Sequence, residues 1–189
     1  MRRRGKRWRW RLEYALLAAL FGLSRLVPWR SLVALGRLAG LAAYHGLGVR
    51  RGVTLANLRA AFGGERSERE LRRLAARTYS NLGATLMEFC KLYDLPRERL
   101  AGLVVFTGLD HVAAATAGGR GALLTTGHFG NWELLGAAVA ARGRPVHYLI
   151  KEQSNPHVDR LQNEIRRRAG IGVIRQGAAA RHLMYALRR

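Results

Sequence analysis

The chain of 189 residues is poor in cysteine and in acidic residues. Its one cysteine, Cys90, excludes a disulfide framework and any zinc cluster built on cysteines, and a lone cysteine is most often a small buried side chain. Twelve Asp and Glu stand against 33 Lys and Arg, so the formal net charge is +21. The hydrophobic share of 49% is too high for a disordered basic tail. Composition and length therefore predict a basic, folded chain with a core.

Acidic residues are scarcest at the N-terminal end. Glu13 is the one Asp or Glu before Glu65, whereas the first 64 residues hold 13 Lys and Arg, a local net charge of +12. The same region lacks an apolar run of the about 20 residues that cross a bilayer. Tyr14–Ser24 is uncharged over 11 residues, and extending it to Trp29 gives 16 with an arginine inside. A short apolar helix beside basic flanks is typical of an anchor on anionic lipid.

Three of the four tryptophans, Trp8, Trp10 and Trp29, flank this apolar segment, as expected for rings at a membrane–water boundary. A signal peptide also begins with basic and apolar residues, but an acidic residue interrupts the pattern here and no small-residue cleavage site follows. Nucleic-acid binding, or solvated charge without a partner, would also account for an excess of basic residues. Zinc-finger spacing, aromatic RNA-binding motifs and recognition-helix signatures are absent from the sequence. We predict that residues 1–52 anchor the chain on an anionic membrane surface, with no nucleic-acid partner.

Hydrophobic periodicity predicts a helical region over residues 53–100. A short helix is expected over 53–62 and a long one over about 68–93. Ser67 and Glu70 have the spacing of a capping box, which places the start of the long helix.

The remainder of the chain alternates short apolar runs with helix-like stretches. The expected strands are 103–106, 122–126, 146–150 and 172–174, and the expected helices are 110–117, 133–141, 156–169 and 178–187. This alternation predicts a mainly parallel sheet covered by helices. The fold class is therefore predicted as α/β, with membrane-associated N-terminal helices and an α/β core over residues 101–189.

The segment from Thr126 to Glu133, TGHFGNWE, falls where an expected strand ends and an expected helix begins. Ligand chemistry in open α/β sheets is usual at this place. Residues five apart on one helix point about 140° apart, so His128 and Glu133 meet only if His128 lies in the loop and Glu133 in the first helical turn. Asn131 is a good N-cap for that helix. A carboxylate beside an imidazole orients it, as in catalytic dyads, although the spacing alone also fits a structural pair.

A metal centre is the weaker interpretation of the same residues. The pattern is not His-Glu-x-x-His, and no third ligand stands at helical spacing. His147 and His157 are unsupported as further ligands. We expect no metal and no cofactor.

The heptad Gly127–Glu133 resembles the signature of the bacterial lipid A biosynthesis acyltransferases, within the lysophospholipid acyltransferase superfamily. It is far more specific than a His–Glu spacing. The family's Tyr-x-x-Arg-Pro resembles Tyr148-Leu-Ile-Lys151-Glu152, where the basic position survives as Lys151. Further similarity covers most of the chain, at Asn57-Leu58, Ala61-Phe62, Ser67, Asn81-Leu82-Gly83, Glu88, Asn155-Pro156, Asp159, Leu161, Arg166, Arg168 and Gly170. Family members continue past the point where this chain stops, so the resemblance implies a core that is incomplete at the C-terminus.

The resemblance implies O-acyl transfer from an acyl thioester, on acyl carrier protein or coenzyme A, to a hydroxyl of a lipid A precursor or related glycolipid. It implies His128 as the general base and Glu133 as the group that supports it. The implied location is the cytoplasmic face of the bacterial inner membrane. The alternative is a non-catalytic basic membrane-surface protein or an inactive fragment of such an enzyme.

Six further residues are expected to bind substrate: Phe129, Asn131, Trp132, Lys151, Arg166 and Arg168. The two aromatic rings suit an acyl chain, with buried packing as the alternative. The two arginines suit an acceptor or carrier phosphate, with a solvated helix face as the alternative. Arg166 also follows Asp159 by seven residues on nearly the same helix face, which allows the two to pair.

Overall fold

The computed structural model describes residues 2–119 and 121–188, and the chain divides into two compact units. The helical unit is Leu20–Lys91, and the α/β unit combines Met1–Ala19 with Leu92–Arg189. The first helix, α1 (Arg2–Leu26), contributes residues to both.

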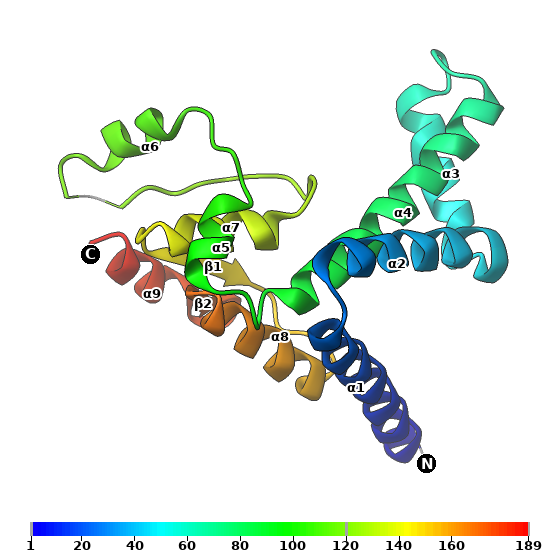
Figure 1. Ribbon diagram of the computed structural model, residues 1–189, viewed down its shortest axis with the longest axis horizontal. Coiled ribbons are helices and arrows are strands. Elements are labelled where there is room, and N and C mark those ends of the chain that lie inside the picture. Colours follow the sequence, from blue (N-terminus) through cyan, green and yellow to red (C-terminus); the bar gives the residue numbers. More distant parts are fainter. Residues whose placement is uncertain (1, 120, 189) are drawn as a thin grey trace. The chain divides into compact units, whose positions relative to one another are not determined.

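In the helical unit the helices predicted over 53–62 and about 68–93 are confirmed, with one end of each shifted by two residues (Figure 1). After α1 its elements are α2 (Trp29–Ala42), the π-helical turn η1 (Ala43–Leu47), α3 (Arg51–Phe62) and α4 (Glu68–Lys91). The predicted capping box is confirmed: the Ser67 backbone N–H donates to Glu70 Oε2 at 2.9 Å, and the Glu70 N–H donates to Ser67 Oγ at 3.4 Å. Cys90 is fully buried in α4, as predicted, and burial raises the pKa of its thiol to about 11.

Helices α2 and α4 pack backbone to backbone. A methyl group on Gly36 would lie 2.5 Å from the carbonyl oxygen of Gly83, and one on Gly83 would meet the carbonyl oxygen of Gly36. Gly40, one turn further along α2, meets the backbone of Tyr79 in the same way. Because glycine has no side chain, it alone permits this approach.

Lys91, the last residue of α4, stabilises the C-terminal end of α1. Its Nζ donates to the carbonyl oxygens of Ser24 at 2.6 Å and Val27 at 3.1 Å. Carbonyl groups at the end of a helix have no N–H partner within the helix, so the ammonium group satisfies them.

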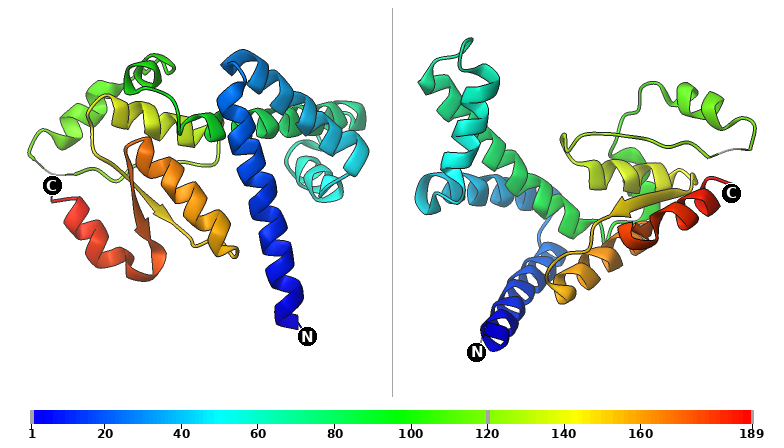
Figure 2. Two further views of the ribbon diagram at one scale, coloured as in Figure 1. Left: turned by 60° about the horizontal axis from the view of Figure 1, so that its bottom comes forward. Right: turned by 180° about the vertical axis from the view of Figure 1, so that it is seen from behind.

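The α/β unit holds a two-stranded parallel sheet. Its elements after α1 are α5 (Arg97–Gly102), α6 (Leu109–Thr116), α7 (Trp132–Ala141), β1 (Val146–Ile150), α8 (Pro156–Arg168), β2 (Ile171–Arg175), the short 3₁₀ turn η2 (Gln176–Ala178) and α9 (Ala179–Ala186). Val146 lies opposite Ile171, and Ile150 opposite Arg175. Figures 1 and 2 show α7 on one side of the strands and α8 on the other. Ala137, in α7, and Ile165, in α8, are fully buried.

Parallel strands with packed helices agree with the α/β class, but the sheet is smaller than predicted. Segments 103–106 and 122–126 were predicted as strands and are not; within the described chain neither has a hydrogen-bonded neighbouring strand. Val105 is 94% exposed, and Leu123 and Leu124 are 66% and 73% exposed. An apolar run becomes a strand only when a neighbouring strand exchanges backbone hydrogen bonds with it, and the described residues offer these segments no such neighbour.

The predicted apolar anchor lies within α1 and the start of α2. Among residues 2–119 and 121–188, no single helix is both long and apolar enough to cross a membrane. The stretches Trp29–Leu47 and Arg51–Phe62 meet the length and composition criteria only together, and the chain bends by 99° between them.

Candidate active site

The heptad Gly127–Glu133 leads into the N-terminus of α7. Gly130 has a φ of 56°, the left-handed conformation that favours glycine. Asn131 caps the helix, because its Oδ1 accepts a hydrogen bond from the Leu134 backbone N–H at 2.9 Å. Glu133 lies in the first turn. The predicted boundary between loop and helix, and the predicted cap, are confirmed.

The carboxylate of Glu133 is buried and paired with Arg166 of α8. Arg166 Nε donates to Oε2 at 3.0 Å, and Nη2 donates to Oε1 at 2.5 Å, which makes the contact bidentate. The side chains of Glu133 and Arg166 are 8% and 13% exposed. A solvated helix face is therefore wrong for Arg166. Since both charges are largely removed from water, each depends on the other.

His128 lies in the exposed loop before α7. Its ring packs edge-on against Trp132, with centroids 4.5 Å apart and an interplanar angle of 73°. In the part of the chain that the structure describes, no hydrogen bond or ion pair joins His128 to Glu133. Phe129 is 84% exposed, so buried packing is wrong for this ring. The His–Glu dyad stays a prediction.

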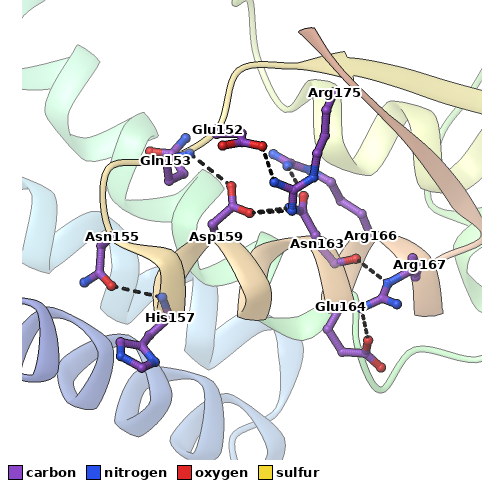
Figure 3. Close-up of polar contacts among 10 residues, drawn as sticks. All are labelled: Glu152, Gln153, Asn155, His157, Asp159, Asn163, Glu164, Arg166, Arg167 and Arg175. Atoms are coloured by element: carbon purple, nitrogen blue, oxygen red, sulfur yellow. Dashed lines mark hydrogen bonds and ion pairs between the residues drawn. The ribbon is translucent and has the colours of Figure 1, made fainter. Parts of the chain in front are cut away.

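Arg166 also connects Glu133 to a row of polar side chains on α8. Arg166 Nη1 donates to Asn163 Oδ1 at 3.0 Å. Asn163 Nδ2 in turn donates to Asp159 Oδ2 at 3.1 Å, and Arg175 Nη2 donates to the same oxygen at 3.2 Å (Figure 3). Asp159 and Asn163 are 6% and 7% exposed. The row therefore runs from the start of α7 to the end of β2 through buried, hydrogen-bonded groups.

A polar groove of about 430 Å³ lies at the far end of this row. Glu152 follows β1 and Arg175 ends β2, so the groove opens at the carboxyl ends of both parallel strands, where α/β sheets bind ligands. An ion pair joins these two side chains and raises the pKa of Arg175. The residues that line the groove are Glu152, Gln153, Pro156, Asp159, Arg160, Asn163, Arg167, Val173 and Arg175.

Tyr148 of β1 contacts the first turn of α7. Its hydroxyl donates to the carbonyl oxygen of Trp132 at 2.5 Å. A methyl group on Gly136 would overlap the Tyr148 ring, so glycine allows the ring to pack against α7. Burial, and then the charge of Glu133, raise the pKa of Tyr148 to about 12.

Residues 5–189 match the family model of the bacterial lipid A biosynthesis acyltransferases. The chain belongs to this family. A lipid A biosynthesis lauroyltransferase of Escherichia coli (strain K12) is 29% identical over 136 residues, which are 72% of this chain and 44% of that protein. The match thus spans less than half the length of this curated relative.

Within this acyltransferase-family chain, two further predicted residues lie outside the Glu133–Arg166 pair. Lys151 is exposed directly after β1. Arg168 lies over the Tyr93 ring at 3.8 Å and pairs with Glu164 at 3.3 Å. Substrate binding by Lys151 and Arg168 stays a prediction.

Sequence reasoning missed the roles of Asn163, Arg175 and Tyr148. Asn163 stands three residues before Arg166 and four after Asp159, so helical spacing alone indicates that the three share a face. Arg175 at a strand end carries a weaker signal. The hydroxyl contact of Tyr148 with α7 has no signal in the sequence.

Across the ranges 2–119 and 121–188, no group of three or more His, Cys, Asp or Glu side chains lies close enough together to hold an ion.

Proposed function

We propose that the chain belongs to a membrane-associated O-acyltransferase that moves a fatty acyl chain from an acyl thioester to a hydroxyl of a lipid A precursor or related glycolipid. The observation that carries the proposal is the heptad Gly127–Glu133 at the start of α7 in a chain that belongs to the family. The E. coli relative is named a lauroyltransferase, which supports acyl transfer as the reaction class.

The chemistry requires one general base. His128 takes the proton of the acceptor hydroxyl while the hydroxyl oxygen attacks the thioester carbonyl carbon. The tetrahedral intermediate then collapses, the carbon–sulfur bond breaks, and the leaving thiolate takes the proton back from the imidazolium. A new ester bond replaces the thioester, and no covalent acyl-enzyme is needed.

Glu133 supports the imidazolium in this proposal. Arg166 and the first turn of α7 hold its carboxylate in place. The His128 ring packs on Trp132, so we propose that it turns toward Glu133 when the acceptor binds. Arg166 then acts through Glu133 as a positioning residue, in place of the phosphate contact expected from the sequence.

The remaining residues predicted to bind substrate have side chains that suit an acyl chain or a phosphate. The exposed ring of Phe129, with Trp132, contacts the acyl chain, while Lys151 and Arg168 attract the phosphate of the acceptor or of the donor. Asn131 caps α7 and so fixes the start of the helix, which positions the neighbouring residues that contact the substrate. The donor is acyl carrier protein or a coenzyme A thioester.

The proposed membrane contact is supported by charge and exposed apolar surface. The first 64 residues carry a net charge of +12, and α1 exposes Trp8, Leu12, Leu16 and Leu23. Basic residues beside exposed apolar side chains suit an anionic bilayer surface, which we propose is the cytoplasmic face of the inner membrane.

The test compares His128→Ala with His111→Ala, a matched change at an exposed histidine of α6, outside the heptad. Thiol release from acyl coenzyme A or acyl carrier protein, and the mass of the lipid product, are measured with vesicles that contain the acceptor. We expect turnover by the unchanged chain and by His111→Ala, and loss of at least a hundredfold for His128→Ala, the typical contribution of a general base. Turnover retained by His128→Ala contradicts the mechanism. Vesicle binding by the unchanged chain without thiol release favours the non-catalytic alternative.

A further inference from the structure

A second cavity, of about 250 Å³, lies where α1 meets the start of α8. We name it the α1–α8 notch; its lining residues are Arg7, Trp10, Arg11, Pro156 and His157. All of them belong to the α/β unit.

The notch is built on a specific contact between segments far apart in the sequence. Asn155, only 5% exposed, caps α8, while its Nδ2 donates to the Trp10 carbonyl oxygen at 2.9 Å and to Glu13 Oε2 at 3.0 Å. The Tyr14 and His157 rings pack with centroids 5.7 Å apart, and Figure 3 shows His157 beside α1. The first backbone N–H groups of α8 already bind Asn155 Oδ1, so the helix terminus itself is not free for a ligand.

The charges in the notch are all of one sign. Arg7 and Arg11 stand one turn apart on α1, where like charges repel. Neither guanidinium makes a hydrogen bond or ion pair with any residue in the ranges 2–119 and 121–188. The nearby carboxylate of Glu13 does not line the notch; hydrogen bonds from Asn155 and Arg9 engage it and lower its pKa. An anion between the two arginines would relieve their repulsion.

The size and walls of the notch suit a phosphate group. Its volume is several times the about 30 Å³ that a water molecule occupies in the liquid, which admits a tetrahedral anion with its ester oxygens. Two planar guanidinium forks suit phosphate oxygens, and the Trp10 indole and Pro156 ring supply an apolar wall for the adjoining ester carbons.

The surroundings of the notch favour phosphate at a lipid surface. Trp8, Leu12 and Leu16 follow one another at four-residue steps and are 69%, 44% and 59% exposed. This apolar stripe runs beside the stripe of Arg7 and Arg11. A helix that buries such a stripe in a bilayer holds its neighbouring arginines at the level of the headgroups.

We propose that the α1–α8 notch binds the phosphodiester of an anionic phospholipid and so docks the α/β unit on the membrane. The proposal rests on the membrane association proposed above and adds a headgroup site to it.

The test uses vesicles of digalactosyldiacylglycerol, a neutral lipid without phosphate, that carry either phosphatidylglycerol or oleate at matched surface potential. Binding of the full chain is measured by cosedimentation. Arg11→Gln is compared with Arg9→Gln, which removes the same charge from the same helix outside the notch. Both changes should weaken binding about fivefold through lost charge, and Arg11→Gln about tenfold more on phosphatidylglycerol through lost hydrogen bonds to phosphate. Arg7→Gln should behave like Arg11→Gln. On oleate, whose carboxylate offers two acceptor oxygens against the four of a phosphodiester, the extra loss for Arg11→Gln should be smaller than on phosphatidylglycerol.

Equal loss for the Arg9 and Arg11 variants on phosphatidylglycerol, or no preference of the unchanged chain for phosphatidylglycerol over oleate, overturns the notch as a phosphate site. Inorganic phosphate added at constant ionic strength separates the two sources of phosphate. If the difference between the Arg9 and Arg11 variants persists until phosphate exceeds the lipid in concentration, the notch prefers the lipid, whereas its loss at phosphate concentrations below that of the lipid shows that free phosphate is the preferred occupant and overturns the lipid assignment.

Failure of the proposed function is distinguishable from failure of this site. His128→Ala leaves vesicle binding unchanged under the proposal. A chain that keeps the difference between the Arg9 and Arg11 variants but releases no thiol contradicts the acyltransferase function alone. A chain that turns over acyl thioester without this difference contradicts the notch alone.

Discussion

The two units of this chain are stabilised by different kinds of helix contact. In the helical unit, Gly36 and Gly83 bring α2 and α4 together by having no side chain at the contact. In the α/β unit, Glu133 and Arg166 join α7 to α8 through a pair of largely buried charges. The first contact fails when an atom is added, and the second fails when a charge is removed. Each unit therefore has its own characteristic vulnerability.

The largest effect is expected from Arg166→Met. The change leaves the Glu133 carboxylate buried without its partner, which costs about 3–5 kcal/mol of the free energy of unfolding. Urea denaturation with hydrogen exchange measures the loss, which should appear in α7 and α8 and spare α2 and α4. Arg160→Met, at an exposed position of the same helix, should change the free energy of unfolding by about 0.5 kcal/mol or less.

The double variant Arg166→Met with Glu133→Met sharpens this prediction. Replacing both partners by apolar side chains should recover most of the lost stability while acyl transfer stays absent. A double variant as unstable as the single one contradicts a pairwise origin of the loss.

In the helical unit, Gly83→Ala should disrupt the contact between α2 and α4. The added methyl group meets the backbone of α2, so the free energy of unfolding should fall by about 1–3 kcal/mol, with faster exchange in α2 and α4. Gly22→Ala is the matched control, because nothing lies within 4 Å of a methyl group there. As helix propensity favours alanine, the control should gain up to about 1 kcal/mol. Destabilisation of the same size by both changes contradicts the close packing of α2 on α4.

Tyr148→Phe should change how the stability of the α/β unit depends on pH. At neutral pH the loss of the hydrogen bond to the Trp132 carbonyl should cost about 1 kcal/mol. The pKa of Tyr148 is raised from 10 to about 12 in the folded state, so the stability from its neutral form is complete below pH 10 and is lost as the pH rises through about 12. The difference in free energy of unfolding between unchanged chain and variant should therefore shrink over that range. A constant difference across it argues against the burial of the phenol.

The smallest effect is expected from Ser67→Ala. Loss of the Ser67 side chain from this exposed capping box should lower the free energy of unfolding by about 0.5 kcal/mol, with the first turn of α4 exchanging faster. Ser67→Thr retains the capping hydroxyl, which also donates to Glu70 Oε2 at 2.7 Å, and should restore most of the stability. Thermal unfolding of the three forms compares them, and an alanine variant as stable as the unchanged chain contradicts the role of the cap.

Local patterns predicted much of the secondary structure. The helix periodicity, the Ser67–Glu70 box and the Asn131 cap depend on residues within one or two turns, so their spacing suffices. The strand predictions for segments 103–106 and 122–126 were wrong. A strand needs a hydrogen-bonding partner from elsewhere in the chain, and an apolar run does not show whether that partner exists.

The candidate site was predicted in position but not in its contacts. The heptad Gly127–Glu133 was correctly placed at a helix start. The partner of Glu133 is Arg166, 33 residues away, whereas spacing suggested a pairing of Arg166 with Asp159. Asp159 pairs with Arg175, beyond the end of its own helix.

The sequence by itself determined the basic N-terminal surface, the helices with their caps, and the family heptad, because these depend on composition and short-range spacing. Only the tertiary structure decided that Glu133 is neutralised by Arg166, that two glycines bring α2 against α4, and that Arg7 and Arg11 meet His157 in one notch. These contacts join residues 33 to 150 positions apart. Burial and the folded path of the chain select such partners, and no local pattern encodes them.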